Sequence, residues 1–279
     1  MAMVCYGMVG VRALRARRWQ SIHNKILKIR QVERQFTHWA VRCEMRRQTM
    51  AKAMQIKREY IEAAYGLLCE KEFDEITIRQ LAKETGRNSA SLYYYFNDLR
   101  SLLSIASVRY LMDYYDTVST VASSYYKAFE INLQSWGCLA WYAFHNVPIY
   151  ENFFLYDSSM SEKALNEYLE AFPEEKDIIT KYFFGESFYS LDLRMRDKWI
   201  LRKSVEEGMI AEKSVEYLGE LDYYLFCGMM GEIRHTYKDE EVFNRSLKKF
   251  IYILTETYRR QLLPGCSMLG CHLETLTNP

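Results

Sequence analysis

The stretch from Ile76 to Leu103 has the spacing of two short helices joined by a tight turn. Within it, Ala82, Gly86 and Leu92 are separated by four and then six residues. Two helices that cross closely need a small residue at the crossing, a turn residue that tolerates positive φ, and a large apolar residue that closes the core between them. Because Ala82, Gly86 and Leu92 supply these in order, the spacing predicts a helix-turn-helix.

The starts of both helices are also marked in the sequence. Thr77 followed by Gln80 can form a capping box at the first helix. Asn88 or Ser89 can cap the second helix, and their short side chains leave room for its amino-terminal end to enter a DNA groove. A helix with one apolar stripe is expected just before the motif, over residues 54–70.

Several sequence blocks together resemble the TetR family of bacterial transcriptional regulators. The blocks are IEAAYGLL (61–68), ITIRQLAKETG (76–86), LYYYF (92–96) and a Leu-Leu pair (102–103). The resemblance implies a three-helix DNA-binding head, placed at residues 54–103, and a larger all-helical body for ligand binding and dimerisation. It also implies binding to a palindromic operator on double-stranded DNA. The alternative is an unrelated helical pair whose tyrosines only pack.

The resemblance also implies which residues contact DNA. Thr77 would meet a phosphate, and Arg79 matches a position that reaches a base edge, where a guanidinium suits guanine. The residues from Ser89 to Ser91 would form the groove-facing start of the recognition helix, followed by three tyrosines. The expected DNA contacts are Thr77, Arg79, Arg87, Asn88, Ser89, Ala90, Ser91, Tyr93, Tyr94, Tyr95 and Arg100.

Two positions depart from the family pattern. The residue after the turn glycine is usually apolar, whereas this chain has Arg87, which we expect to point outward to a phosphate. The family usually has a lysine where this chain has Leu99, and we expect Arg100, one residue later, to take over that phosphate contact.

Basic residues are concentrated at the amino terminus and not in the motif. Residues 1–50 carry eleven Lys/Arg and two Asp/Glu, a balance of +9, whereas residues 51–116 carry nine against ten, a balance of −1. Binding as a dimer, or help from the basic arm, would therefore matter for DNA affinity. Residues 1–53 are expected to be an extension. It is either an amphipathic helix that lies along phosphates or a membrane surface, or a segment that adds little, including sequence upstream of the true start.

The remainder is expected to be helical, which makes the predicted fold class all-α. Only 4 Pro and 12 Gly occur in the 279 residues, and apolar residues mostly recur at three- and four-residue spacing. A helix over residues 99–118 would link the head to a body over residues 104–264. Further helices are expected over residues 121–147, 149–171, 174–203, 213–238 and 239–263, before a tail over residues 265–279.

Bulky aromatic residues in the middle of the body are candidates for an effector pocket. Such a pocket would suit a small hydrophobic or aromatic molecule. An aromatic stripe at helical spacing is, however, more often plain core. The candidates are Trp136, Trp141, Tyr142, His145, Phe153, Tyr182, Phe184 and Tyr189.

The last two expected helices have the clearest apolar stripes in the body. The resemblance implies that they pair with their copies in a four-helix homodimer interface; otherwise they would form a bundle within one chain. DNA geometry also favours a dimer, because two heads read half-sites about 34–36 Å apart.

Several kinds of protein are disfavoured by the sequence. No window contains 18 uncharged apolar residues, so we expect no membrane span. The seven scattered cysteines suit a reducing cytoplasm. Cys266, Cys271 and His272 lack a fourth ligand, and the five histidines form no cluster typical of a metal site or a catalytic triad. We therefore expect no metal, no cofactor and no catalysis.

Taken together, these patterns predict a ligand-responsive regulator of transcription, most simply a homodimeric repressor released from its operator by an effector. The alternative is a constitutive DNA-binding or architectural protein whose helical body serves protein contacts.

Overall fold

The computed structural model describes residues 39, 41–122, 124–125, 127–155, 158–176 and 191–269, and the chain divides into two compact units, 1–56 and 57–279. In the first unit, residues 41–56 are helical and mostly exposed. Most of the expected amphipathic extension, and the tail beyond residue 269, lie outside the described residues. The predicted boundaries at residues 53, 103 and 264 stay predictions.

The head, for which we take residues 57–103 of the second unit, begins with a helix over residues 57–68. Three short elements follow, namely η1 (Phe73–Glu75), α2 (Ile78–Thr85) and η2 (Ser89–Tyr94). The predicted capping box is confirmed, because Thr77 and Gln80 cap each other's backbone at the start of α2. Gly86 ends α2 with a φ of 63°, in the left-handed region that glycine adopts without strain.

The second helix of the motif is a six-residue 3₁₀ helix, η2, where the spacing suggested a regular helix. Local side-chain bonds explain the tighter winding. Asn88 accepts a hydrogen bond from the Ala90 backbone at 2.9 Å, and Ser91 Oγ donates to the Asn88 carbonyl at 2.6 Å. Such bonds compete with the α-helical pattern. Leu92 is buried, as its predicted role in closing the core requires.

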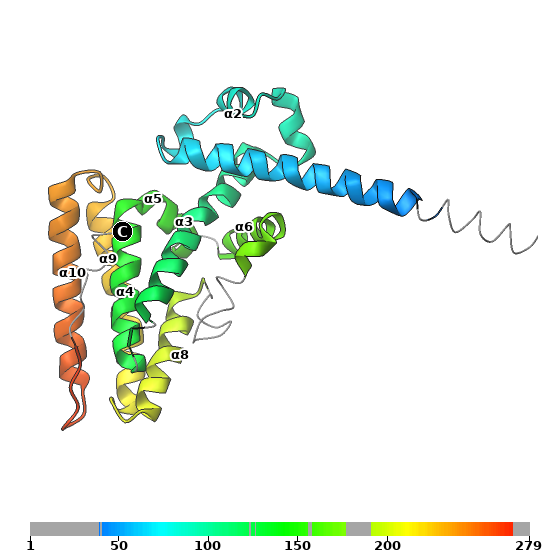
Figure 1. The fold of residues 1–279 in the computed structure, drawn as a ribbon. Helices are drawn as coiled ribbons and strands as arrows, with labels where there is room; N and C mark the ends of the chain where they lie inside the picture. Colours follow the sequence, from blue (N-terminus) through cyan, green and yellow to red (C-terminus); the bar gives the residue numbers. More distant parts are fainter. Residues whose placement is uncertain are drawn as a thin grey trace, which may run out of the picture. The chain divides into compact units, whose positions relative to one another are not determined.

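The helix α3 (Leu99–Ala122) runs from the head into the body, as predicted for residues 99–118 (Figure 1). It packs against α4 and α6. Most of its residues are buried, and one polar stripe, which includes Arg109, Asp116 and Thr120, is exposed. Its buried residues include Leu102, Leu103, Ile105, Ala106, Val108, Leu111, Tyr114, Tyr115 and Val118.

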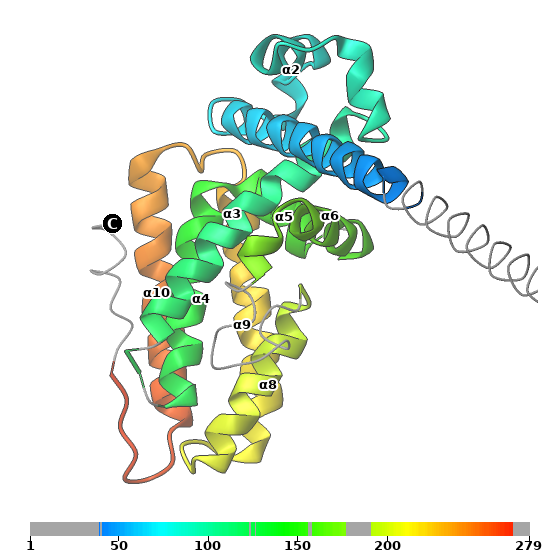
Figure 2. The same ribbon diagram turned by 45° about the vertical axis from the view of Figure 1, so that its right-hand side comes forward.

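The body, residues 104–264, is built around α4, which contacts α3, α8, α9 and α10 (Figure 2). Its elements after α3 are α4 (Ala128–His145), α5 (Val147–Phe154), α6 (Ser158–Ala171), η3 (Pro173–Glu175), α8 (Leu193–Glu206), α9 (Glu212–Ile233) and α10 (Glu240–Gln261). The all-helical prediction is confirmed over the described residues, where one isolated bridge joins Ile210 to Leu262. No helix in this described part has the length and apolarity that crossing a membrane requires.

Several predicted helices have different bounds in the structure. In place of one helix over residues 174–203, the described residues form η3 and α8, and the helix expected over residues 213–238 ends at Ile233. The helix expected over residues 121–147 begins at Ala128, because α3 continues to Ala122. The helix expected over residues 149–171 is two helices, α5 and α6. Pro148 lies in the first turn of α5, where a missing backbone N–H costs nothing, so it starts a helix as well as ending the preceding one.

A group of polar side chains lies at the centre of the body. Asp197 Oδ1 accepts hydrogen bonds from Asn132 Nδ2 at 2.6 Å and from Trp136 Nε1 at 2.8 Å. Asp222 Oδ2 accepts one from Tyr258 OH at 2.7 Å. Burial raises the pKa of Asp197 to about 6, while burial and the neighbouring Asp197 raise the pKa of Asp222 well above its ordinary value. Burial and the neighbouring carboxyl group therefore both favour the protonated form of Asp222.

Ion pairs fasten the head to the body within the second unit. Lys57 Nζ lies 3.1 Å from Glu167 Oε2 on α6. The Arg58 guanidinium bonds Glu174 at 2.8 Å and lies over the Phe172 ring at 5.0 Å. These contacts place α6 directly against the first helix of the head.

Candidate nucleic-acid interface

Two large aromatic side chains project from η2 into solvent. Tyr93 is 57% exposed and Tyr94 is 86% exposed, although tyrosine usually buries most of its ring. The first turn of η2, before Leu92, carries only short side chains, including the exposed Ala90. Exposed tyrosines on a short element with small neighbours can stack on sugars and donate hydrogen bonds to phosphates or base edges.

Arg79 on α2 is exposed beside this surface. It has no hydrogen bond or ion pair within the described part of the chain, so its guanidinium is available to an external acceptor. An arginine in this state can form a bidentate pair with a guanine or a phosphate.

Other predicted contacts are already engaged inside the head. The Thr77 hydroxyl donates to Gln80 Oε1 at 2.9 Å, and Asn88 Oδ1 caps η2. Ser91 Oγ bonds the hydroxyl of Tyr60, and the Tyr95 ring lies 6.2 Å from the Tyr60 ring. Thr77 thus caps α2, whereas Asn88, Ser91 and Tyr95 position η2; their contacts with DNA stay predictions.

Arg87 forms an ion pair with Glu59 of the first helix. The hydrogen bond to Glu59 is the main cause that raises the pKa of Arg87. The pair ties the turn of the motif to the helix before it and offsets the charge of the guanidinium. The expected phosphate contact of Arg87 stays a prediction, and the structure adds this internal role.

The five predicted effector residues that the structure describes lie in different surroundings. Trp136 is buried and bound to Asp197, whereas Tyr142 OH lies 2.6 Å from Thr117 Oγ1. The Trp141 and His145 rings are in contact, with centroids 4.4 Å apart and planes tilted by 55°, and burial lowers the pKa of His145. Three further candidates, Tyr182, Phe184 and Tyr189, lie outside the described residues.

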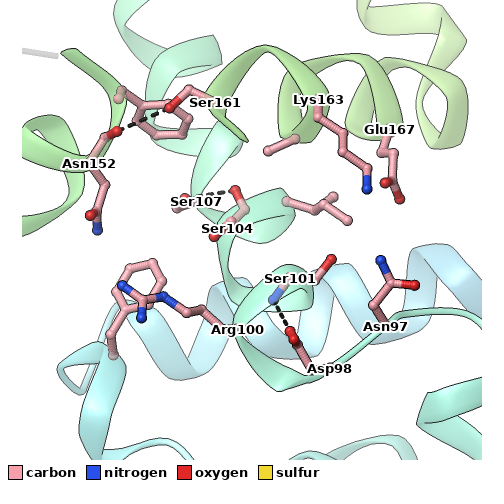
Figure 3. A pocket seen from close by; sticks show the side chains of 14 residues that line it. Asn97, Asp98, Arg100, Ser101, Ser104, Ser107, Asn152, Ser161, Lys163 and Glu167 are labelled. Atoms are coloured by element: carbon pink, nitrogen blue, oxygen red, sulfur yellow. Dashed lines mark hydrogen bonds between the residues drawn. The ribbon is translucent and has the colours of Figure 1, made fainter. Parts of the chain in front are cut away.

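Phe153, in contrast, lines a cavity of about 410 Å³ between the head and the body (Figure 3). We call it the junction cavity. Arg100 lines it as well, so the structure gives this predicted DNA contact a second environment; its phosphate contact stays a prediction. The remaining wall is formed largely by serines and amides from the start of α3, α5 and α6, including Ser101, Asn152 and Ser161. No sequence pattern singled them out, because they come from three distant segments.

Comparison with known proteins agrees with this geometry. Residues 61–104 match the family model described as "Bacterial regulatory proteins, tetR family". A solved transcriptional regulator from Cytophaga hutchinsonii ATCC 33406 is 15% identical, with a TM-score of 0.50, over 73% of this chain and 97% of that chain. A TetR transcription regulator from Haloarcula marismortui ATCC 43049 is also 15% identical, with a TM-score of 0.48, over 75% of this chain and 99% of that chain. No curated protein gives a match. The likeness to the Cytophaga protein indicates a shared fold that extends beyond the motif.

Proposed function

The chain belongs to the TetR family of transcriptional regulators through its DNA-binding head, and we propose that it is a homodimeric repressor, released from a palindromic operator by a small-molecule effector. The observation that carries this proposal is the surface of Arg79, Tyr93 and Tyr94, which is exposed on a rigidly capped helix-turn-helix. A regulator of this kind acts in the cytoplasm, where bacterial DNA lies.

The outer faces of α9 and α10 support the proposed homodimer. Tyr217 and Tyr224 on α9 and Tyr252 on α10 are 51%, 60% and 68% exposed. Gly228 and Gly231 also lie on the open side of α9, with no neighbouring atom where a Cβ would stand. Exposed aromatic residues beside small ones suit the close packing of a second pair of helices. We propose that these two helices meet their copies there.

The helix α3 supports a coupling between effector and operator. It belongs to both the head and the body, and its Tyr110 ring lies 5.3 Å from the Tyr65 ring of the head's first helix. An effector that binds one head orientation better than another would shift the population toward that orientation. Operator affinity then falls if, in the favoured orientation, the distance between the two heads does not match the spacing of the two half-sites. The aromatic or hydrophobic class of this effector stays a prediction.

Gel-shift titration against the DNA beside the protein's own gene tests the proposal. The wild-type protein should prefer this DNA to random duplex, and its binding should weaken as salt rises. The double variant Arg79→Ala, Tyr93→Ala should lose the preference, whereas Arg202→Ala, an exposed arginine on α8, should keep it. A wild-type protein with no preference for that DNA would overturn the proposed function.

A further inference from the structure

We infer that the junction cavity binds a small hydroxylated organic anion of the sugar-phosphate class, with Arg100 and Lys163 as the two cations of its wall. Arg100 lies in the first turn of α3 and Lys163 lies on α6, so the two cations approach the cavity from different elements (Figure 3). The regulatory part of this inference rests on the proposed function; the binding site itself does not.

The charged residues of the cavity wall are two cations, Arg100 and Lys163, and two carboxylates, Asp98 and Glu167. Its two carboxylates are already engaged, since Glu167 pairs with Lys57 at 3.1 Å and Asp98 accepts a hydrogen bond from the Ser101 backbone at 2.7 Å. Arg100 and Lys163 have no hydrogen bond or ion pair with any described residue. Because Lys57 offsets Glu167, the two cations without partners outnumber the one remaining carboxylate, Asp98, and this balance favours an anionic ligand.

The polar wall suits a ligand that carries hydroxyl groups. The hydroxyls of Ser101 and Ser104 and the amides of Asn97 and Asn152 line the cavity. Within the described ranges, none of these four side chains forms a hydrogen bond. Each can both donate and accept, as sugar hydroxyls can, so together they match a polyol better than an apolar effector.

The floor of the cavity is apolar and well packed. Ile105, Phe153 and Ala164 are 1%, 4% and 4% exposed, and they offer a surface to the carbon skeleton of a ligand. A volume of about 410 Å³ lies in the range of small-molecule sites. The polar side chains of the wall match the hydroxyl and phosphate groups of a phosphorylated sugar, and the apolar residues match its carbon skeleton.

The position of the cavity gives the ligand a direct mechanical effect. Its wall includes head residues, such as Phe73 and Asn97, and body residues on α5 and α6. A ligand that bonds Arg100 and Lys163 together bridges the first turn of α3 to α6. It therefore favours one orientation of the head over others, which is the differential affinity that an effector needs.

Isothermal titration calorimetry on the full chain without DNA tests the site, with glucose 6-phosphate as the probe. Glucose and inorganic phosphate, its two components, serve as separate controls. Glucose 6-phosphate should bind more tightly than either component. Arg100→Gln and Lys163→Gln should each raise the dissociation constant about tenfold, whereas Lys213→Gln, on the exposed face of α9, should leave it unchanged.

The outcomes separate this inference from the proposed function. Absent binding, binding no tighter than that of inorganic phosphate, or binding that neither variant weakens would each overturn the sugar-phosphate site. Operator binding in the gel shift without any binding of glucose 6-phosphate rejects the site and keeps the DNA function. Binding of glucose 6-phosphate by a protein with no operator preference keeps the site and rejects the proposed function.

Discussion

Lys238, which follows α9, forms an ion pair with Glu72, the residue that caps η1 in the head. Tyr237 donates a hydrogen bond to the same carboxylate. Burial alone would raise the pKa of Glu72, but the bonds from Lys238 and Tyr237 outweigh it and lower the pKa. The head is thus joined to the body at this point as well as through α6.

Replacing Glu72→Gln should cost about 0.5 kcal/mol of unfolding free energy at pH 7, because the ion pair is partly exposed and screened by solvent. A carboxylate with a lowered folded-state pKa stabilises the fold above its unfolded pKa, and this contribution is lost as pH falls through the folded value. Urea denaturation should therefore show a difference from wild type that shrinks below about pH 4. Glu162→Gln, an exposed glutamate on α6, is the matched control. An undiminished difference at low pH would contradict the role of this ion pair.

The buried carboxyl groups should make stability fall as pH rises. Folding raises the pKa values of Asp197 and Asp222. Above about pH 4, where an unfolded aspartate loses its proton, the folded state therefore holds more protons than the unfolded state. The positive charge of Arg196 lowers the pKa of Asp197, but by less than burial raises it. Unfolding free energy should therefore decrease with pH across this window.

Asp222→Asn should remove part of this dependence. An asparagine keeps the acceptor for Tyr258 and supplies a donor toward Asp197 without a titrating proton. We expect a gain of about 1 to 2 kcal/mol at pH 8 and a flatter pH profile in chemical denaturation. Asp74→Asn, at an exposed site in η1, should change neither the unfolding free energy at pH 8 nor the pH profile. A loss of stability at every pH would mean that the carboxylate is ionised and needed in that form.

Two glycines in the head should respond to alanine in opposite directions. Gly86 has a φ of 63°, so Gly86→Ala places a side chain in left-handed backbone and should cost about 1 kcal/mol. Gly66 is exposed in the first helix with open space around it, so Gly66→Ala should gain about 0.5 to 1 kcal/mol from helix propensity. Thermal unfolding of both variants checks the pair. Equal effects would refute the conformational explanation.

A charged side chain in the proposed dimer surface should separate the subunits. Tyr224→Glu combined with Tyr252→Glu puts unpaired carboxylates on the outer faces of α9 and α10, so sedimentation should show monomers. Tyr94→Glu changes a still more exposed tyrosine in η2 and should leave the dimer intact while it abolishes operator binding. A double variant that sediments as wild type would place the interface elsewhere.

Local geometry was predictable from the sequence because its causes are local. The Thr77 and Gln80 capping box and the glycine turn each depend on a few adjacent residues, and their bonds are found as expected. The 3₁₀ winding of η2 was missed, although its cause is also local. Asn88 was recognised as a cap, but the bond from Ser91 to its carbonyl was not anticipated.

Long-range partners were not predictable in the same way. Glu59 precedes Arg87 by 28 residues, and no periodicity links them, so the arginine was expected to face a phosphate. The buried Asp197 and Asp222 look in the sequence like ordinary solvated residues of amphipathic helices. Their burial depends on how α8 and α9 cross, which is set by packing and not by spacing along the chain. The junction cavity is not predictable from the sequence for the same reason, because three separate segments form its wall.

The burial of most α3 residues has a thermodynamic consequence. Because these residues complete the cores of both head and body, we expect that neither part melts and leaves the other intact. The two functions that we propose, reading DNA and sensing a small molecule, would share one cooperative unfolding transition. A mutation at a buried position of this helix would therefore weaken both functions together, so these positions are constrained by both.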